Sequence, residues 1–422
     1  MTAHPPHAAQ CPPGAHTSPS EAPLPIHGPE FDADPHATYR RLRRQGPIAP
    51  VEIAPGVYGY LAVTYRAVVH LLRNSPKLFA KDPTANWQAL MDGKVPADSP
   101  ARVMMQPRDN ALWKDGEEHQ RLRGAITTAL ARVDTYAVTD AVARIADGLV
   151  DTFAAAGEAD LVAQYADPLA MLSVIDLFSC PADIGERIVH AVTRLFAAGP
   201  DAADANADLE AACLDLVRLK RDQPGRDIVT YLTQTGLGDE EMVQTLLLVF
   251  GAAAPPAGKH IASGVQRYLT DQRFSGSVHT GIRPVAAALE EVLWDEPPVA
   301  NYCPLYAQGP QRIDHVLVEP GYPILCSFAA ANRDPELAVA PDDRVGNRAH
   351  LAFSAGPHAC PAPGLARVIS ETAVERLLDR LSGLRLAVDP AEIPALPGTF
   401  LAGPAALPVR FKPHTPLAPA GK

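Results

Sequence analysis

The segment Phe353-Ser354-Ala355-Gly356-Pro357-His358-Ala359-Cys360-Pro361-Ala362 decides the fold of this chain. It is predicted to be a loop that leads into a single cysteine, with a helix expected directly after it, over Gly364–Leu381. The N-terminus of a helix carries partial positive charge and unpaired N–H groups, and both favour a thiolate. We therefore expect a lowered pKa for Cys360, as is typical of a nucleophile or a metal ligand.

Three other residues of this segment suit a flat ligand. Gly356 lets the loop turn tightly and approach such a ligand closely. Phe353 is placed to pack beneath it, and His358, two residues before the cysteine, is placed to reach an anionic edge. A lone cysteine after a turn is more often a buried structural thiol. The four residue types at these offsets together favour a cofactor site instead.

The segment resembles the Phe-x-x-Gly-x-His/Arg-x-Cys-x-Gly/Ala loop of the cytochrome P-450 family, the heme-thiolate monooxygenases, and Leu365-Ala366-Arg367 resembles the start of the helix that follows that loop. The resemblance implies a mainly α fold, with a large helical domain, a small β-rich part and heme b (iron protoporphyrin IX) between them. It implies that Cys360 is the axial ligand of the iron. It also places four further residues in the cofactor-binding loop: Phe353, Gly356, His358 and Ala362.

An upstream segment, Asp115–Arg123, is similar to the family's Asp-x-x-Glu-His-x-Arg-Leu-Arg pattern. His119 and Arg123 are four residues apart, so they share one face of a helix. Two cationic donors on one face suit a heme propionate. The alternative, an ordinary solvated helix face, is weaker beside the Cys360 loop.

The central helix, expected to begin at Asp239, departs from the family pattern. Family members carry an acid and an alcohol where this helix crosses the heme, and these groups relay protons to bound dioxygen. The alignment puts Pro255 and Pro256 at those positions, so no catalytic residue is assigned there. Because proline lacks an N–H and strains a helix interior, we expect the helix to break over the iron. Lys259 and His260 are the proton-active side chains nearby. One alternative is that either of them substitutes as the proton relay, but we expect both at a surface turn.

Two further departures concern arginines. The family pairs Glu with Arg in a Glu-x-x-Arg motif, whereas this chain has Glu291 and Trp294. We expect Glu291 to bond directly to Arg344, in a segment (341–344) that resembles the one whose arginine locks this region, while Trp294 fills the volume. In the following strand, Leu305 stands where the family usually has an arginine that binds a propionate.

Composition excludes several other classes of protein. The 422 residues are 47% hydrophobic and 20% charged, as in globular proteins, and the net charge of −11 disfavours a nucleic-acid binder. No apolar run is long enough to span a bilayer, and no Lys or Arg precedes Arg40, which argues against a secretory signal. The six cysteines form no paired framework, so we expect a reducing, cytoplasmic location and no membrane association.

The chain is expected to consist of a disordered Pro-rich arm over 1–30, a single heme domain over 31–412 and a flexible tail over 413–422. Helices dominate the expected elements, with strands at Val57–Val63, Arg312–Val318 and Tyr322–Ser327.

Three functions stay open at this stage. The first is an oxygenase that acts on a small apolar molecule, with electrons from a ferredoxin or flavodoxin that docks near Arg367, Arg376 and Arg380. The second is a heme-thiolate enzyme that uses peroxide or an activated substrate, which the loss of the acid and alcohol favours. The third is a heme-binding regulatory or scaffold protein without turnover.

Overall fold

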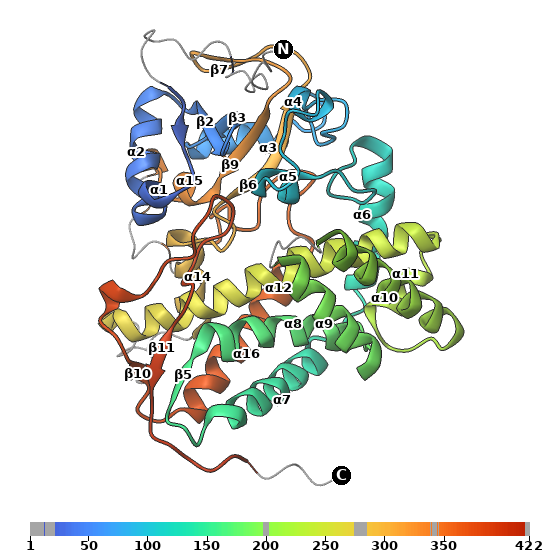
Figure 1. Ribbon diagram of the computed structural model, residues 1–422, viewed down its shortest axis with the longest axis vertical. Helices are drawn as coiled ribbons and strands as arrows, with labels where there is room; N and C mark the ends of the chain where they lie inside the picture. The colour runs from blue at the N-terminus through green and yellow to red at the C-terminus, as the bar shows by residue number, and fades with distance from the viewer. Residues whose placement is uncertain are drawn as a thin grey trace, which may run out of the picture.

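The computed structural model describes Pro12 and residues 22–196, 202–273, 285–337, 339, 344 and 346–417. Figure 1 shows a part built around a sheet and a part built from helices, with the long helix α12 (Asp239–Thr270) running between them. The structure thus confirms a mainly helical fold with a smaller β-rich part. Among the described helices, none has both the length and the apolar character that a bilayer crossing requires.

In the helical part, α8, α10 and α16 pack against α12, and α7 packs in turn against α8 and α16 (Figure 1). In chain order the other described α-helices are α1 (Pro29–Ala33), α2 (Pro35–Gln45), α3 (Tyr65–Arg73), α4 (Gln88–Met91), α5 (Pro100–Met105), α6 (Gly116–Leu130), α7 (Thr135–Phe153), α8 (Asp167–Leu177), α9 (Ala182–Phe196), α10 (Ala202–Asp222), α11 (Ile228–Thr233), α14 (Val285–Asp295), α15 (Phe328–Asn332) and α16 (Pro363–Arg380).

The strands form three sheets in the described residues. The largest has the order β1-β2-β3-β9-β6-β4, the second has the order β10-β11-β5, and β7 pairs with β8. Their bounds are β1 (Leu24–Pro25), β2 (Ile48–Ala54), β3 (Val57–Ala62), β4 (Phe79–Ala80), β5 (Glu158–Asp160), β6 (Asn301–Ala307), β7 (Gln311–Ile313), β8 (Val316–Val318), β9 (Pro323–Ser327), β10 (Arg385–Leu386) and β11 (Pro408–Arg410).

Local sequence signals explain where helices begin. The side chain of Asp34 caps α2 by accepting a bond of 2.9 Å from the N–H of Ala37, and Pro35 occupies the first turn. The side chain of Thr64 caps α3 in the same way. A capping oxygen satisfies one of the N–H groups that the first turn leaves unpaired, and a proline there loses nothing.

Helix α12 runs unbroken through Pro255 and Pro256, so the expected break is wrong. Each proline removes one N–H, which leaves only the carbonyls of residues 251 and 252 without their helical partners. The rest of this 32-residue helix keeps its ladder and packs against α8, α10, α14 and α16. Packing over that length outweighs the local loss.

A close approach to α8 helps to hold α12 in place beyond the prolines. A Cβ atom at Gly258 would lie 2.5 Å from Oδ1 of Asp167 and 3.3 Å from its Cα. Only glycine allows the two backbones to come this near.

At both ends of the expected heme domain, the folded structure extends beyond the bounds that the sequence predicted. Residues 24–25 form β1, which pairs with β2 in parallel, and Pro29 begins α1, so the expected arm ends before these residues. The N–H of His414 donates to the carbonyl of Ala154, so the expected tail continues against α7. Backbone hydrogen bonds order both segments despite their many prolines. Residues 1–11, 13–21 and 418–422 lie outside the described residues, and the single domain over 31–412 stays a prediction.

Residues Arg312–Val318 form no single strand. They turn at Asp314, which has φ of 50°, and form the hairpin of β7 and β8. Asp tolerates this left-handed conformation better than most residues, and the sequence pattern alone did not reveal the turn.

We predict that Pro256→Ala stabilises the protein. The substitution returns an N–H to the interior of α12, where proline costs about 3 kcal/mol relative to alanine. Because proline also restricts the unfolded chain, we expect a net gain of about 1–3 kcal/mol in the free energy of unfolding by urea. The control is Pro100→Ala at the exposed first position of α5, where no N–H is missed. A Pro256→Ala protein no more stable than the wild type would contradict the prediction.

Candidate functional site

The Cys360 loop is held tightly against the β-rich part. Gly356 has φ of +71°, and a Cβ atom there would lie 2.2 Å from the carbonyl oxygen of Leu72. The N–H of Cys360 donates to the carbonyl of Phe353 at 2.9 Å. These two contacts fix the loop, and they leave the half-buried cysteine next to the start of α16.

The expected lowering of the Cys360 pKa is wrong. Burial raises the pKa of this thiol, although an N–H bond from Ala362 and the charges of Arg123 and Arg367 oppose the rise. The bond from Ala362 to Sγ is long, at 3.4 Å, and Pro361 has no N–H to add to it. Desolvation therefore outweighs the helix terminus, and a bound metal ion would favour the thiolate form.

A buried carboxylate anchors the loop from behind. Oε2 of Glu290, on α14, accepts a bond of 2.7 Å from Nε of Arg367, and Oε1 accepts one of 2.9 Å from Nη2. Oε1 also lies 2.8 Å from Nε2 of His350. Arg367 in turn lies 4.8 Å from the centroid of the Phe353 ring, and the His350 ring lies 5.8 Å from it. One acidic side chain thus fixes the residues that support Phe353.

Burial alone would raise the pKa of Glu290, but the bonds from His350 and Arg367 outweigh it and lower the pKa to about 2. Sequence reasoning missed both Glu290 and His350. For Glu290 the available signal was its position directly before Glu291. Adjacent residues of a helix point in different directions, so the two carboxylates were bound to face different neighbours.

Arg344 bonds to Asp295 and not to Glu291, so that expectation is wrong. Its Nη1 donates to Oδ1 of Asp295 at 2.6 Å, and Nη2 of Arg267 donates to Oδ2 of the same carboxylate at 3.0 Å. Trp294 is fully buried and its Nε1–H donates to the carbonyl of Asn347 at 2.9 Å. Asp295, the residue directly after Trp294, therefore supplies the carboxylate that binds Arg344 at the end of α14. Residues 341–343 lie outside the described residues.

The structure brings together His119, Arg123 and His358, as expected, and adds Asp115. The rings of His119 and His358 lie 4.0 Å apart, and Nε2 of His358 lies 3.7 Å from Oδ1 of Asp115. Arg123 donates to the carbonyl of Ala359, in the Cys360 loop. Nε2 of His119 is buried with no hydrogen-bond partner in the described residues. We call these four residues the polar cluster.

Both histidines of the polar cluster favour the neutral form. Burial, together with the charges of His358 and Arg123, lowers the pKa of His119 to about 4. Burial also lowers the pKa of His358, although its interaction with the Asp115 carboxylate opposes this. A buried polar nitrogen without a partner costs free energy, so His119 is set up to bind a polar group that the described residues do not provide.

A heme group fits these residues. Cys360 would offer sulfur to iron, the polar cluster would offer donors to propionates, and Gly356 lets the loop pack closely against the carbonyl of Leu72. The described residues hold no cluster of three or more His, Cys, Asp or Glu that would bind a metal ion by itself, and their cysteines are all free. A porphyrin-bound iron needs no such cluster, because one protein ligand can hold it and a cysteine thiolate is one of the ligands that do.

Helix α12 places Pro255 and Pro256 half-buried, next to the exposed Gly251 and Ala252. The expectation of a surface turn at Lys259 and His260 is wrong, because the helix continues and buries both.

Neither side chain is free to act as a proton relay. Nζ of Lys259 donates to Asp167 at 2.9 Å, and the His260 ring lies 3.0 Å from Oγ of Ser370 and 3.0 Å from the carbonyl of Leu289. Both therefore serve packing with α8, α14 and α16.

The arginines expected to receive an electron donor form ion pairs within the chain. Arg376 donates two bonds of 2.7 Å to Asp147 on α7, and Arg380 bonds to Asp147 and Asp151. Arg367 is held by Glu290. The two aspartates lie one helical turn apart and face α16, so these charges neutralise each other and form no basic patch.

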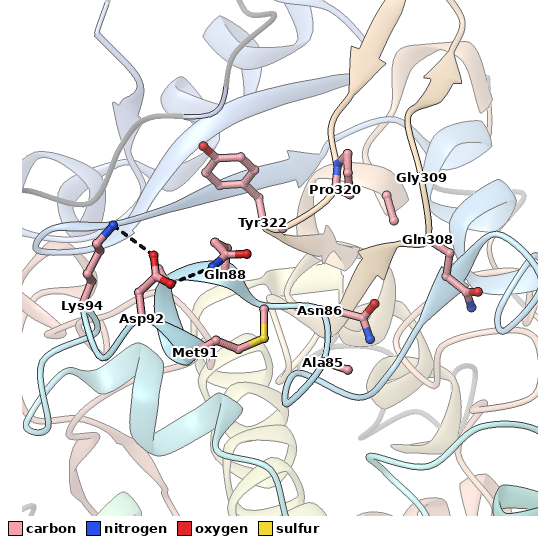
Figure 2. A pocket seen from close by; sticks show the side chains of 13 residues that line it. Ala85, Asn86, Gln88, Met91, Asp92, Lys94, Gln308, Gly309, Pro320 and Tyr322 are labelled. Atoms are coloured by element: carbon pink, nitrogen blue, oxygen red, sulfur yellow. Dashed lines mark hydrogen bonds and ion pairs between the residues drawn. The ribbon is translucent and has the colours of Figure 1, made fainter.

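A separate cavity of about 610 Å³ opens between α4 and the ends of β6 and β9. Figure 2 shows Asp92 bonded to both Lys94 and Gln88 at its wall, at 3.0 and 2.7 Å. Its charged groups are therefore already paired, and none of the predicted site residues lines it.

No family model matches the chain. It is 29% identical, over 90% of its length and 96% of the relative's, to 2-hydroxy-5-methyl-1-naphthoate 7-hydroxylase of Streptomyces carzinostaticus. It is 30% identical to cytochrome P-450-SU2 of Streptomyces griseolus, over 95% of this chain and 98% of that one. Among solved structures it is similar to CYP154A1 of Streptomyces coelicolor, with a TM-score of 0.78, 30% identity, and coverage of 92% of this chain and 100% of that one.

We predict that Glu290→Gln removes an acid-sensitive part of the stability. The folded pKa of about 2 lies below the ordinary 4.5, so this contribution is present above pH 4.5 and is lost as the pH falls towards 2. At pH 7 we expect the variant to lose about 3 kcal/mol of unfolding free energy. Urea unfolding at a series of pH values measures both effects.

The matched control for this measurement is Glu186→Gln, which changes an exposed carboxylate on α9 and is expected to cost less than about 0.5 kcal/mol. If Glu290→Gln unfolds with the same pH dependence as the wild type, Glu290 does not anchor the loop in the way described.

Proposed function

Because the chain belongs to the cytochrome P-450 family, a family of monooxygenase-type oxidoreductases, we propose that it binds heme b through Cys360 and oxidises a small apolar molecule. The observation that carries this proposal is the convergence at one loop. Cys360 offers the sulfur, Arg123 bonds to the residue before it, and the His119 ring, whose Nε2 has no partner among the described residues, lies against the His358 ring.

The heme supplies oxidising power, since a thiolate ligand donates electron density that favours cleavage of the O–O bond. The chain's own residues position the group. The bond from Ala362 to the sulfur, the sole N–H donor that the described residues give it, leaves the thiolate electron-rich. His119, Arg123 and His358 are placed to donate to the propionates.

A second candidate, an enzyme that uses peroxide or an activated substrate, is favoured by one feature of α12. Between Phe250 and Ile261 the chain has no Asp, Glu, Ser or Thr, and Lys259 and His260 are engaged elsewhere. A peroxide brings its own oxygen and electrons, so it needs less proton delivery from the helix. A heme-binding protein without turnover is the third possibility.

For the first candidate we propose a ferredoxin- or flavodoxin-type electron donor and a substrate that is small and mostly apolar. The naphthoate hydroxylase named above acts on a small aromatic molecule. Because Arg367, Arg376 and Arg380 are paired within the chain, the donor is expected to dock by shape and by other charges on the Cys360 side.

The oxidant is tested by supplying small aromatic probes with either NADPH, ferredoxin and its reductase, or hydrogen peroxide alone. We expect product with the reductase system. Product with peroxide alone supports the second candidate, and bound heme without product by either route supports the third.

We predict that Cys360→Ser loses the spectrum of thiolate-bound heme. The reduced protein with carbon monoxide reports the ligand opposite the gas, and a serine oxygen does not reproduce the sulfur signal. The matched control is Cys303→Ser, since the half-buried Cys303 lies close by and bonds to Ser354 at 3.7 Å. A wild-type-like spectrum in Cys360→Ser, or its loss in Cys303→Ser, would refute the assignment.

A further inference from the structure

Lys81 is a lysine that the protein buries almost completely. Lys81 is 1% exposed, and its Nζ donates to the carbonyl of Pro304 at 2.8 Å. The ammonium also lies 5.9 Å from the centroid of the Trp113 ring. Among the described residues no carboxylate forms an ion pair with this ammonium. Burying a charge with one neutral acceptor is unfavourable, and an ammonium has donors left over for a second partner.

The sheet register places Lys81 beside the position where the resemblance leads one to expect an arginine. β4 pairs with β6 in antiparallel fashion, with Phe79 opposite Ala307 and Ala80 opposite Tyr306. One further step in the same register brings Lys81 opposite Leu305. Leu305 is 1% exposed within an apolar cluster and carries no charge. Lys81 therefore lies opposite the position at which β6 has no cation.

Lys81 is also joined to the polar cluster. Its backbone N–H donates to Oδ2 of Asp115 at 2.6 Å, and Asp115 faces His358, whose ring lies against His119. Lys81, Arg123 and Asp115 together carry one net positive charge (two cations, one anion), and without Lys81 the other two sum to zero. An anionic group beside His119 is therefore better balanced when Lys81 is present.

We propose that Lys81 is a propionate-binding residue and supplies the cation that is missing at position 305. The inference rests on the proposed heme site. Held by the Pro304 carbonyl, the ammonium has a further N–H to donate to a propionate oxygen.

The experiment compares heme release from the ferric protein to excess apomyoglobin. In Lys81→Gln the amide keeps a donor for Pro304 but removes the charge, and we expect release about tenfold faster than in the wild type. The midpoint potential of the heme falls in the same variant, because a nearby cation stabilises the reduced state. Lys81→Arg keeps both values near the wild type. The matched control, Lys94→Met at the cavity of Figure 2, leaves both unchanged.

The double variant Lys81→Gln, Leu305→Arg separates charge from packing. It returns the cation to β6, and we expect it to restore slow release. If Lys81→Gln alone fails to fold, the rate of heme release from this double variant tests the inference. Slow release then supports it and fast release overturns it. Unchanged release in Lys81→Gln, or fast release that neither arginine variant restores, would overturn the inference. A wild-type protein that takes up no heme defeats the proposed function itself, which is a separate outcome.

Discussion

The bonds that the buried carboxylate of Glu290 accepts from Arg367 and His350 hold the rest of the site in place. They join α14 to α16 and to the segment before Phe353, so the Cys360 loop is fixed before any ligand arrives. Removing one partner of a buried ion pair is costly, so we expect this contact to be hard to replace. Asp295, with Arg267 and Arg344, adds a second tie at the end of the same helix.

The fixed loop explains the electrostatics of the site. Burial raises the pKa of Cys360, so the protein alone does not favour a thiolate. Burial also keeps His119 and His358 neutral, and Nε2 of His119 has no hydrogen-bond partner among the described residues. Sulfur and donors are therefore held at a free-energy cost that a bound cation and bound carboxylates relieve. The fold and the proposed cofactor depend on each other in this sense.

The sequence predicted most helices because caps such as Asp34 and Thr64 are local signals. It grouped His119, Arg123 and His358 with the Cys360 loop because motifs record residues that lie together in the fold. It failed where distant packing decides. α12 passes through Pro255 and Pro256 because its neighbours stabilise it. Arg344 meets Asp295, and Arg376 meets Asp147, because of how whole helices sit together. Lys81 gave no signal, since its place beside β6 depends on strand register.

The central claim is that the sulfur of Cys360 binds the iron of a heme. X-ray absorption at the iron edge of the purified protein tests it most directly, because it reports the atoms bonded to iron. The account predicts a porphyrin-bound iron with one sulfur neighbour. An iron surrounded by nitrogen and oxygen alone in the wild-type protein would contradict it.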